Sequence, residues 1–185
     1  FDFENLFVFD LANNHQGDLN HAKKIIKNIG EICIENNIYG GLKLQFRDLD
    51  TFIHKDYLRD ENNPHIKRFL STKFSWSDFD KIKNYITKFN MKSICTPFDE
   101  TSVDKIVEMK FDILKVASCS ANDWPLLEKI SLSGLPVIIS TGGLLIEEID
   151  QLVSFFEHKG VDFAIMHCIS IYPTPFDESQ LGFIS

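Results

Sequence analysis

Short apolar runs alternate with amphipathic stretches along most of the chain. Short runs bounded by turn residues are typical of buried strands, and apolar residues at helical spacing are typical of amphipathic helices. The pattern predicts strands at residues 6–9, 41–46, 92–95, 113–116, 137–140 and 163–167. It predicts helices at residues 21–35, 77–89, 100–109, 125–133 and 146–158. Alternation of this kind indicates a parallel sheet with right-handed crossovers.

One connection is much longer than the others. Residues 47–75 are mainly polar and separate the second predicted strand from the second predicted helix. A loop that folds over an active site and an exposed insertion without a function are both compatible with this composition, and we expect the former. Ser75 or Ser77 is expected to cap the helix that follows.

Two folds share this alternation, a doubly wound open sheet and a closed barrel. Residues 11–17 read LANNHQG and lack the glycine-rich fingerprint of a dinucleotide-binding sheet. Nearly every predicted strand ends in a polar residue, as in barrels whose active site is assembled from the βα loops. We therefore predict an α/β fold, a (β/α)8 TIM-type barrel with about six of its eight units present. The chain starts at Phe1 rather than Met and ends at Ser185 after a motif-rich loop, so we expect residues 1–185 to be an incomplete barrel domain.

Composition narrows the expected partners and compartment. The 185 residues carry a net charge of -8 and the pI is about 5.2, which argues against a nucleic-acid-binding surface. The four cysteines form no C-x-x-C pair and are too sparse for a disulfide scaffold, so reduced thiols are expected. No apolar run reaches transmembrane length, and the start lacks the regions of a signal peptide. The prediction is a cytoplasmic protein without nucleic-acid or membrane partners.

Polar side chains cluster at the ends of the predicted strands, where a barrel places its active site. Taken singly, each could merely cap the adjoining loop, and for Thr96 and Ser140 that interpretation is favoured. Lys43 and Gln45 lie two residues apart, so both side chains point to one face of their strand, the predicted barrel interior. The full candidate set is Asp10, Lys43, Gln45, Thr96, Lys115, Ser118, Ser140, Thr141 and Tyr172.

Two lysines of this set lie inside apolar runs. Lys43 falls within the strand predicted at 41–46, and Lys115 within the strand predicted at 113–116. Burying an unpaired ammonium costs several kcal/mol, so each lysine needs a carboxylate, an anionic ligand or a lowered pKa. Asp10 could pair with one of them, which leaves a positive charge for an anionic ligand. An internal salt-bridge network is the alternative.

Other features are less specific. Residues 140–143 read STGG, which is typical either of an anion-binding turn before a helix or of a simple tight turn. His15 and His167 lie at the ends of predicted strands and could be metal ligands or substrate contacts, and for His167 a core or substrate contact is favoured over a metal. No complete metal-ligand spacing is visible among the histidines.

Several sequence strings resemble the N-acylneuraminate (sialic acid) synthase family. They occur in the family's order and span nearly the whole chain. Each string alone is a weak signal, whereas together they are highly specific. The strings are DLANNHQGDLNHAKKII, KLQF, CTPFDETSVD, LKVASCSANDWPLLEKI, PVIISTGG and MHCISIYPTP. The chain is therefore similar to the N-terminal barrel domain of that family, truncated after the sixth strand.

The resemblance implies a specific reaction. Phosphoenolpyruvate would condense with the aldehyde of an N-acetylated, ManNAc-like hexosamine to give a nonulosonic (sialic-type) acid and phosphate. Asp10, Gln45 and Tyr172 match family positions around the metal and the sugar. Phosphoenolpyruvate contacts are implied at Lys43, Thr96, Lys115, Ser118, Ser140 and Thr141. The candidate catalytic residues are then Asp10, Lys43 and Lys115.

The resemblance also implies a cofactor and a partner. A divalent cation, Mn²⁺ or Mg²⁺, would polarise the acceptor aldehyde as a Lewis acid, and its histidine ligands would lie beyond Ser185. A C-terminal antifreeze-like domain, also beyond Ser185, would complete the site across a homodimer. The expected partners are therefore small-molecule substrates and a second copy of the protein, and residues 1–185 alone are expected to be inactive.

The sequence departs from the family pattern at three positions. Asp10 stands where a longer Glu is usual, Ser120 replaces an acidic residue, and Ser170 replaces a frequent Asn. A hydroxyl cannot supply the charge or the basicity of a carboxylate, so the acceptor sugar stays open. Two other functions also stay open: a Schiff-base aldolase or lyase with Lys115 as the nucleophile, and a degenerate barrel that binds a sugar phosphate without turnover.

Overall fold

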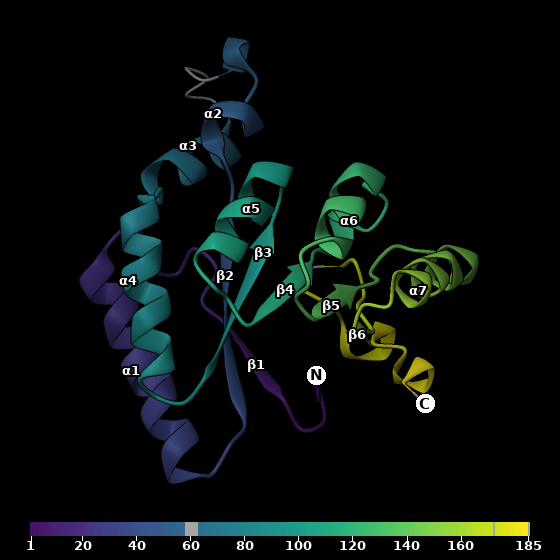
Figure 1. The fold of residues 1–185 in the computed structure, drawn as a ribbon, viewed down its shortest axis with the longest axis horizontal. Coiled ribbons are helices and arrows are strands. Elements are labelled where there is room, and N and C mark those ends of the chain that lie inside the picture. The colour runs from purple at the N-terminus through teal and green to yellow at the C-terminus, as the bar shows by residue number, and fades with distance from the viewer. Residues whose placement is uncertain (58–62, 172, 185) are drawn as a thin grey trace.

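Six parallel strands form one curled sheet in sequence order, β1-β2-β3-β4-β5-β6 (Figure 1). The computed structural model describes residues 1–57, 63–171 and 173–184. Every neighbouring pair of strands is parallel, as the strand–helix alternation predicts. The strands are β1 (Phe7–Asp10), β2 (Gly40–Phe46), β3 (Lys92–Pro97), β4 (Ile113–Val116), β5 (Val137–Ser140) and β6 (Phe163–Met166).

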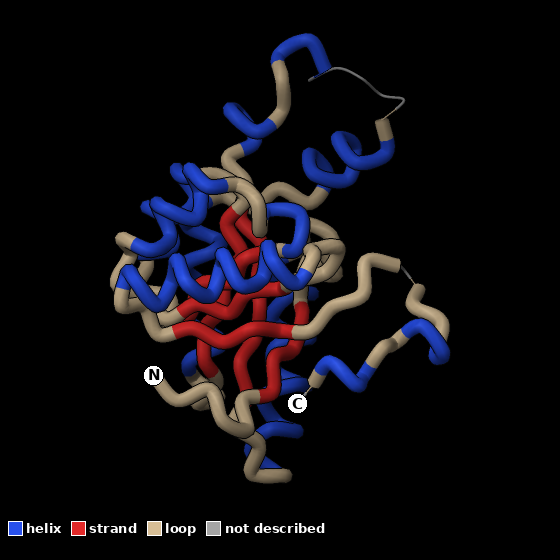
Figure 2. The backbone as a smooth tube through the Cα atoms, turned by 90° about the vertical axis from the view of Figure 1, so that its right-hand side faces the viewer, coloured by secondary structure: helices blue, strands red, loops and turns tan. Residues whose placement is uncertain are grey.

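Helices cover the convex side of the curl, with α1 and α4 packed beside each other (Figures 1 and 2). Each predicted helix is present, with ends shifted by a few residues. The helix predicted from residue 21 begins at Leu19, because the Asp18 carboxylate caps it by accepting from two backbone N–H groups. Ser75, and not Ser77, caps α4. The helices are α1 (Leu19–Glu35), α4 (Trp76–Thr87), α5 (Glu100–Glu108), α6 (Trp124–Ser131) and α7 (Ile146–Lys159).

The insertion at 47–75 contains more regular structure than a loop. Helix α2 (Leu49–Phe52), the 3-10 turn η1 (Lys55–Tyr57) and helix α3 (Pro64–Ser71) rise beyond the carboxyl ends of β2 and β3 (Figure 1). Asn63 caps α3, and Pro64 stands at its first position. Leu49, Ile53, Ile66 and Phe69 form a small apolar cluster that holds these pieces together.

The two faces of the sheet have different cores. On the convex face, apolar side chains of every strand pack against the helices in one large cluster. On the concave face, Ile94, Ile113 and Ile138 form a smaller apolar floor. Gly41 makes room for this floor, because a Cβ there would lie 2.6 Å from the Cδ1 atom of Ile94. Above the floor, toward the carboxyl ends of the strands, the concave face is polar.

The α/β class and the strand order agree with the predicted barrel, since six parallel strands that alternate with helices curl into a half-barrel. Closure into eight units stays a prediction. In the described ranges all four cysteines are free, as expected. None of the helices in these ranges is both long and apolar enough to cross a membrane. Short 3-10 turns complete the chain: η2 (Ser118–Ser120), η3 (Phe176–Glu178) and η4 (Leu181–Phe183).

Candidate active site

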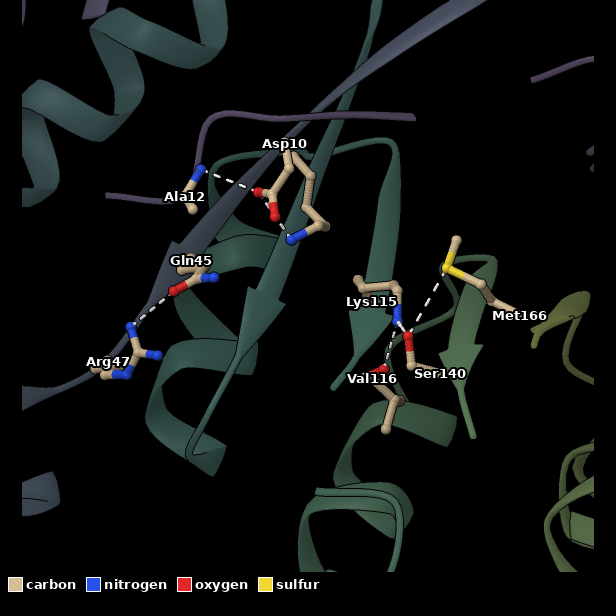
Figure 3. A network of polar contacts seen from close by, with 9 residues as sticks. Asp10, Ala12, Gln45, Arg47, Lys115, Val116, Ser140 and Met166 are labelled. Carbon is tan, nitrogen blue, oxygen red and sulfur yellow. Dashed lines mark hydrogen bonds and ion pairs between the residues drawn. The ribbon is translucent and has the colours of Figure 1, made fainter. Parts of the chain in front are cut away.

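A layer of polar side chains lies on the concave face at the carboxyl ends of the strands (Figure 3). The strand register explains the layer, because Asp10 pairs with Lys43 and Gln45 pairs with Thr96 across neighbouring strands. Side chains alternate between the two faces of a strand, so every second residue of β2 points into the curl. The strand residues Asp10, Lys43, Gln45 and Thr96 of the predicted set therefore come together in space, as the barrel hypothesis requires.

Lys43 is neutralised within the protein. Its Nζ atom lies 2.9 Å from Oδ1 of Asp10, which also accepts a hydrogen bond from the backbone N–H of Ala12 at 3.0 Å. The Lys43 side chain is 14% exposed and the Asp10 side chain 51% exposed. The expectation that Asp10 pairs with one of the two lysines is confirmed. Because the carboxylate is half exposed, solvent weakens the attraction between the two charges.

Lys115 has no carboxylate partner among the described residues. Its Nζ atom donates to the carbonyl of Val116 at 2.7 Å and to the hydroxyl of Ser140, and the residue is 4% exposed. Burial lowers the pKa of Lys115 to about 8, and the positive charge of Lys43 acts in the same direction. A charged amine has three N–H donors, and two are used here. The third is available to an anion.

Ser118, Ser140 and Thr141 surround the start of the turn after β5. The Ser118 hydroxyl accepts from the backbone N–H of Gly142 at 3.1 Å. The Thr141 hydroxyl donates to the carbonyl of Met166 at 3.1 Å. The Ser140 hydroxyl, besides its contact with Lys115, lies 3.8 Å from the sulfur of Met166. These contacts fix the three hydroxyls around the turn, and the Ser140 hydroxyl contacts the Lys115 amine.

The STGG segment forms a tight turn. The backbone N–H of Leu144 donates to the carbonyl of Thr141 at 3.1 Å, and Gly143 has a φ of +80°. This combination is typical of a type II turn, in which the third residue needs the positive φ that glycine tolerates. The N–H groups of Thr141 and Gly142 donate to protein acceptors, so the hydrogen bonds favour the tight-turn interpretation over the anion-binding one.

Thr96 and Gln45 occupy the middle of the polar layer. The Thr96 hydroxyl is buried and has no hydrogen-bond partner among the described residues. A buried hydroxyl without a partner is costly, so its free donor is better explained by a ligand than by loop capping. Gln45 accepts a hydrogen bond through Oε1 from Nη1 of Arg47 at 3.1 Å.

Arg47 is the residue that the sequence analysis missed. Its guanidinium carbon lies 3.8 Å from the ring centre of Phe98 and 4.5 Å from that of Phe69. Burial lowers the pKa of Arg47 to about 10, with the charge of Arg68 adding to the effect. The signal was present in the sequence, because Arg47 continues the two-residue spacing of Lys43 and Gln45 on one strand face.

The remaining candidates differ in their surroundings. His15 is buried and stacks on Phe74 with ring centres 4.1 Å apart, and burial lowers its pKa to about 4. His167 contacts the carbonyl of Ser179 through Nε2 at 3.0 Å, a structural contact. Tyr172 lies outside the described residues. No group of three His, Cys, Asp or Glu side chains that could hold a metal ion occurs in the described part of the chain.

These features match a known family. A family model described as the NeuB family matches residues 40–185, most of the chain. The chain belongs to the NeuB family. The resemblance to sialic acid synthases that the motifs indicate is thereby confirmed.

Solved and curated NeuB-type relatives agree with this assignment. The chain is 44% identical to a spore coat polysaccharide biosynthesis protein E from Chromobacterium violaceum, with a TM-score of 0.94, covering 98% of this chain and 54% of that one. It is 29% identical to an N-acetylneuraminic acid synthetase from Leptospira borgpetersenii in complex with citrate, with a TM-score of 0.80, covering 97% and 59%. It is 28% identical to N-acetylneuraminate-9-phosphate synthase of Drosophila melanogaster, covering 96% of this chain and 49% of that protein. The chain thus spans about half the length of these relatives.

Proposed function

We propose that the complete protein condenses phosphoenolpyruvate with the aldehyde of an N-acetylated hexosamine, giving a nonulosonic acid and phosphate. Family membership and the names of the sialic acid synthase relatives support this reaction class. The Leptospira relative was solved with citrate, a small carboxylate anion, which supports an anion site in the family.

Lys115 is the observation that carries the proposal. A buried ammonium with no carboxylate partner among the described residues is costly unless an anion binds to it. The hydroxyls of Ser140 and Thr96 lie in the same polar layer, and Thr96 has an unused donor. Phosphoenolpyruvate carries both a phosphate and a carboxylate, and either could accept the free N–H of Lys115.

The reaction divides between the two halves of the layer. C3 of phosphoenolpyruvate bonds to the aldehyde carbon, the aldehyde oxygen takes up a proton, water adds to C2, and phosphate leaves. Lys115 stabilises the charge on the phosphate side. Asp10 and Lys43, 2.9 Å apart, form an acid–base pair that could deliver the proton and accept one from water.

A divalent cation cannot be assigned to this part of the protein. The described residues hold no suitable group of three ligands, and the Asp10 carboxylate already binds Lys43. Dependence on Mn²⁺ or Mg²⁺, ligands beyond residue 185, a homodimer and a cytoplasmic location stay predictions for the complete protein.

The test is incubation of the full-length protein with phosphoenolpyruvate, Mn²⁺ or Mg²⁺, and a panel of N-acetylated hexosamines. We expect one acceptor to give equal amounts of phosphate and of a new 2-keto acid. Absence of phosphate release with every acceptor would overturn the proposal. Tight binding of phosphoenolpyruvate without turnover would instead support the degenerate sugar-phosphate-binding barrel.

The Schiff-base alternative rests on the lowered pKa of Lys115. A pKa of about 8 leaves a larger fraction of neutral amine at neutral pH than an ordinary lysine has, and a neutral amine can attack a carbonyl. Borohydride treatment in the presence of pyruvate would trap such an adduct. If mass spectrometry finds the adduct at Lys115, the Schiff-base mechanism replaces the condensation mechanism. If Lys115 is unmodified, the Schiff-base alternative is excluded.

A further inference from the structure

A small pocket lies where the insertion meets the carboxyl end of β2, beside the polar layer. It encloses about 40 Å³, room for roughly three water molecules. It therefore fits one substituent of a substrate rather than a sugar ring. Its polar lining is Asn13, His15, Gln45, Arg47, Thr72 and Lys73, and we refer to it as the Arg47 pocket.

Two of the lining side chains present N–H donors whose orientation is settled by their neighbours. Nδ1 of His15 accepts from the backbone N–H of Gly17 at 3.1 Å, and the lowered pKa keeps the ring neutral. The ring proton is therefore on Nε2. Oε1 of Gln45 accepts from Arg47, which can only donate, so the amide NH₂ of Gln45 is the free end.

The charge of the Arg47 pocket is positive. Among the residues that the structure describes, Arg47 and Lys73 line it and no carboxylate does. Nε of Arg47 is buried without a hydrogen-bond partner among the described residues. Asp99, whose charge acts on Arg47, already accepts from the backbone N–H groups of Asp48 and Ser102. Lys73 has only a loose contact with Asp50, at 3.7 Å.

Stacking on aromatic rings explains how the Arg47 guanidinium is held in place, but it does not explain why this side chain is charged. Phe98 follows β3 and Phe69 belongs to α3, so the Arg47 guanidinium joins the insertion to the sheet. An apolar side chain would pack between these rings without the cost of burying a charge. Arg47 is desolvated, has unused N–H groups and lies beside further donors. Such an arrangement suits the binding of an anionic group.

We propose that the Arg47 pocket binds an anionic substituent, a phosphate or a carboxylate, of the acceptor sugar. The proposal rests on the proposed condensation, because it takes the acceptor to lie against Gln45. It makes Arg47 a specificity-determining residue: a charged acceptor gains hydrogen bonds there, whereas a neutral acceptor leaves the guanidinium desolvated and unpaired.

The experiment compares three acceptors in the full-length protein: an N-acetylated hexosamine, its 6-phosphate, and the corresponding uronic acid. Phosphate release from phosphoenolpyruvate gives kcat/KM for each. We expect kcat/KM for one of the two charged acceptors to exceed that for the neutral acceptor by roughly tenfold or more. The preferred acceptor shows whether the pocket binds a phosphate or a carboxylate. Arg47→Gln should lower kcat/KM for that acceptor roughly ten- to a hundredfold more than it changes kcat/KM for the neutral acceptor.

Arg68→Gln is the matched control. Arg68 lies over the ring of Phe69 at 5.6 Å and is exposed, but it does not line the pocket. The Arg68→Gln variant should keep the preference for the charged acceptor. If Arg47→Gln does not fold, as judged by circular dichroism, Arg47→Lys keeps the charge but lacks the planar fork, and should reduce the preference partially.

A binding measurement tests the proposal for the Arg47 pocket independently of the condensation reaction. Calorimetric titration with a hexosamine 6-phosphate and a hexuronic acid, without phosphoenolpyruvate, needs no turnover. Binding of either that is lost in Arg47→Gln but kept in Arg68→Gln supports the proposal even if no condensation occurs. Equal binding to wild type and Arg47→Gln, no binding of either anion, or a preference for the neutral acceptor overturns it while leaving the condensation proposal standing.

Discussion

The two lysines of the polar layer have similar sequence surroundings but opposite electrostatic situations. Lys43 is paired with the Asp10 carboxylate, and the pair is partly open to solvent. Lys115 is buried, donates to a carbonyl and a hydroxyl but to no carboxylate among the described residues, and has a lowered pKa. A paired lysine contributes to the fold without a ligand, whereas an unpaired one costs stability until an anion arrives. The comparison therefore separates a self-contained ion pair from a site that is open to an anion.

The largest expected difference is in ligand affinity and turnover. Lys115→Met should lower kcat/KM of the full-length protein for phosphoenolpyruvate by roughly a hundred- to a thousandfold, as removal of a preorganised donor does. Lys43→Met should weaken phosphoenolpyruvate binding less, about tenfold, because Asp10 already uses part of the Lys43 charge. Initial rates of phosphate release measure kcat/KM, and calorimetric titration with phosphoenolpyruvate measures the loss of binding in each variant. Equal losses of phosphoenolpyruvate binding in the two variants would contradict the distinction between the two lysines.

Stability should change in opposite directions. Lys115→Met removes a buried charge, and a pKa lowered from 10.5 to about 8 corresponds to about 3 kcal/mol at pH 7. The free energy of unfolding should rise by up to that amount. Lys43→Met breaks a half-exposed pair and should lower it by about 1 kcal/mol or less. Urea denaturation followed by circular dichroism measures both changes, and a destabilised Lys115→Met would contradict the account.

The pH dependence follows from the same shift. Between pH 8 and pH 10.5 the unfolded chain holds a proton on Lys115 that the folded protein has released. Stability should therefore rise with pH across that window, at a slope of at most about 1.4 kcal/mol per pH unit. Lys115→Met should lack this rise, whereas Lys43→Met should keep it. Denaturation midpoints at several pH values decide the point.

Packing near Lys115 gives a smaller effect. A Cβ at Gly142 would lie 2.8 Å from the Ser170 hydroxyl and 3.0 Å from that of Ser118, so Gly142→Ala should cost about 2 kcal/mol. Gly182→Ala is the control, because a Cβ there meets nothing within 4 Å. Its thermal midpoint should match the wild type. A Gly142→Ala variant as stable as the control would show that this turn can shift to accommodate a Cβ without loss of stability.

The smallest expected change is at the other end of the layer. Asp10→Asn frees Lys43, and because the pair is half exposed the effect on stability should be below about 1 kcal/mol. Inorganic phosphate should bind a few-fold more tightly, since the layer becomes more positive. Phosphate titration of wild type and Asp10→Asn checks this, and weaker binding would mean that Asp10 positions Lys43 for the anion.

Much of this arrangement could be predicted from the sequence. Strands β2 to β5 are buried on both faces, so their apolar runs mark them clearly, and the polar interruptions mark the concave side. That Asp10 would pair with one of the two lysines followed from charge and burial alone. The family match was predictable because short motifs occurred in order along the chain.

Other parts depend on tertiary contacts that a sequence pattern does not display. Helices α2 and α3 are too short for a clear period and are stabilised by caps and a small cluster. The stack around Arg47 joins Phe98 and Phe69, which come from separate segments. Which lysine Asp10 would pair with could not be predicted either, because it depends on the register of β1 and β2.

Proton uptake on phosphoenolpyruvate binding tests the central claim most directly. At pH 9 a group with a pKa of about 8 is mainly neutral, and an anion beside it favours the charged form. Calorimetry of the full-length protein in two buffers of different ionisation enthalpy should show uptake of close to one proton for wild type and for Lys43→Met, and none for Lys115→Met. Binding without proton uptake in the wild type, or equal uptake in Lys115→Met, would contradict Lys115 as the anion site.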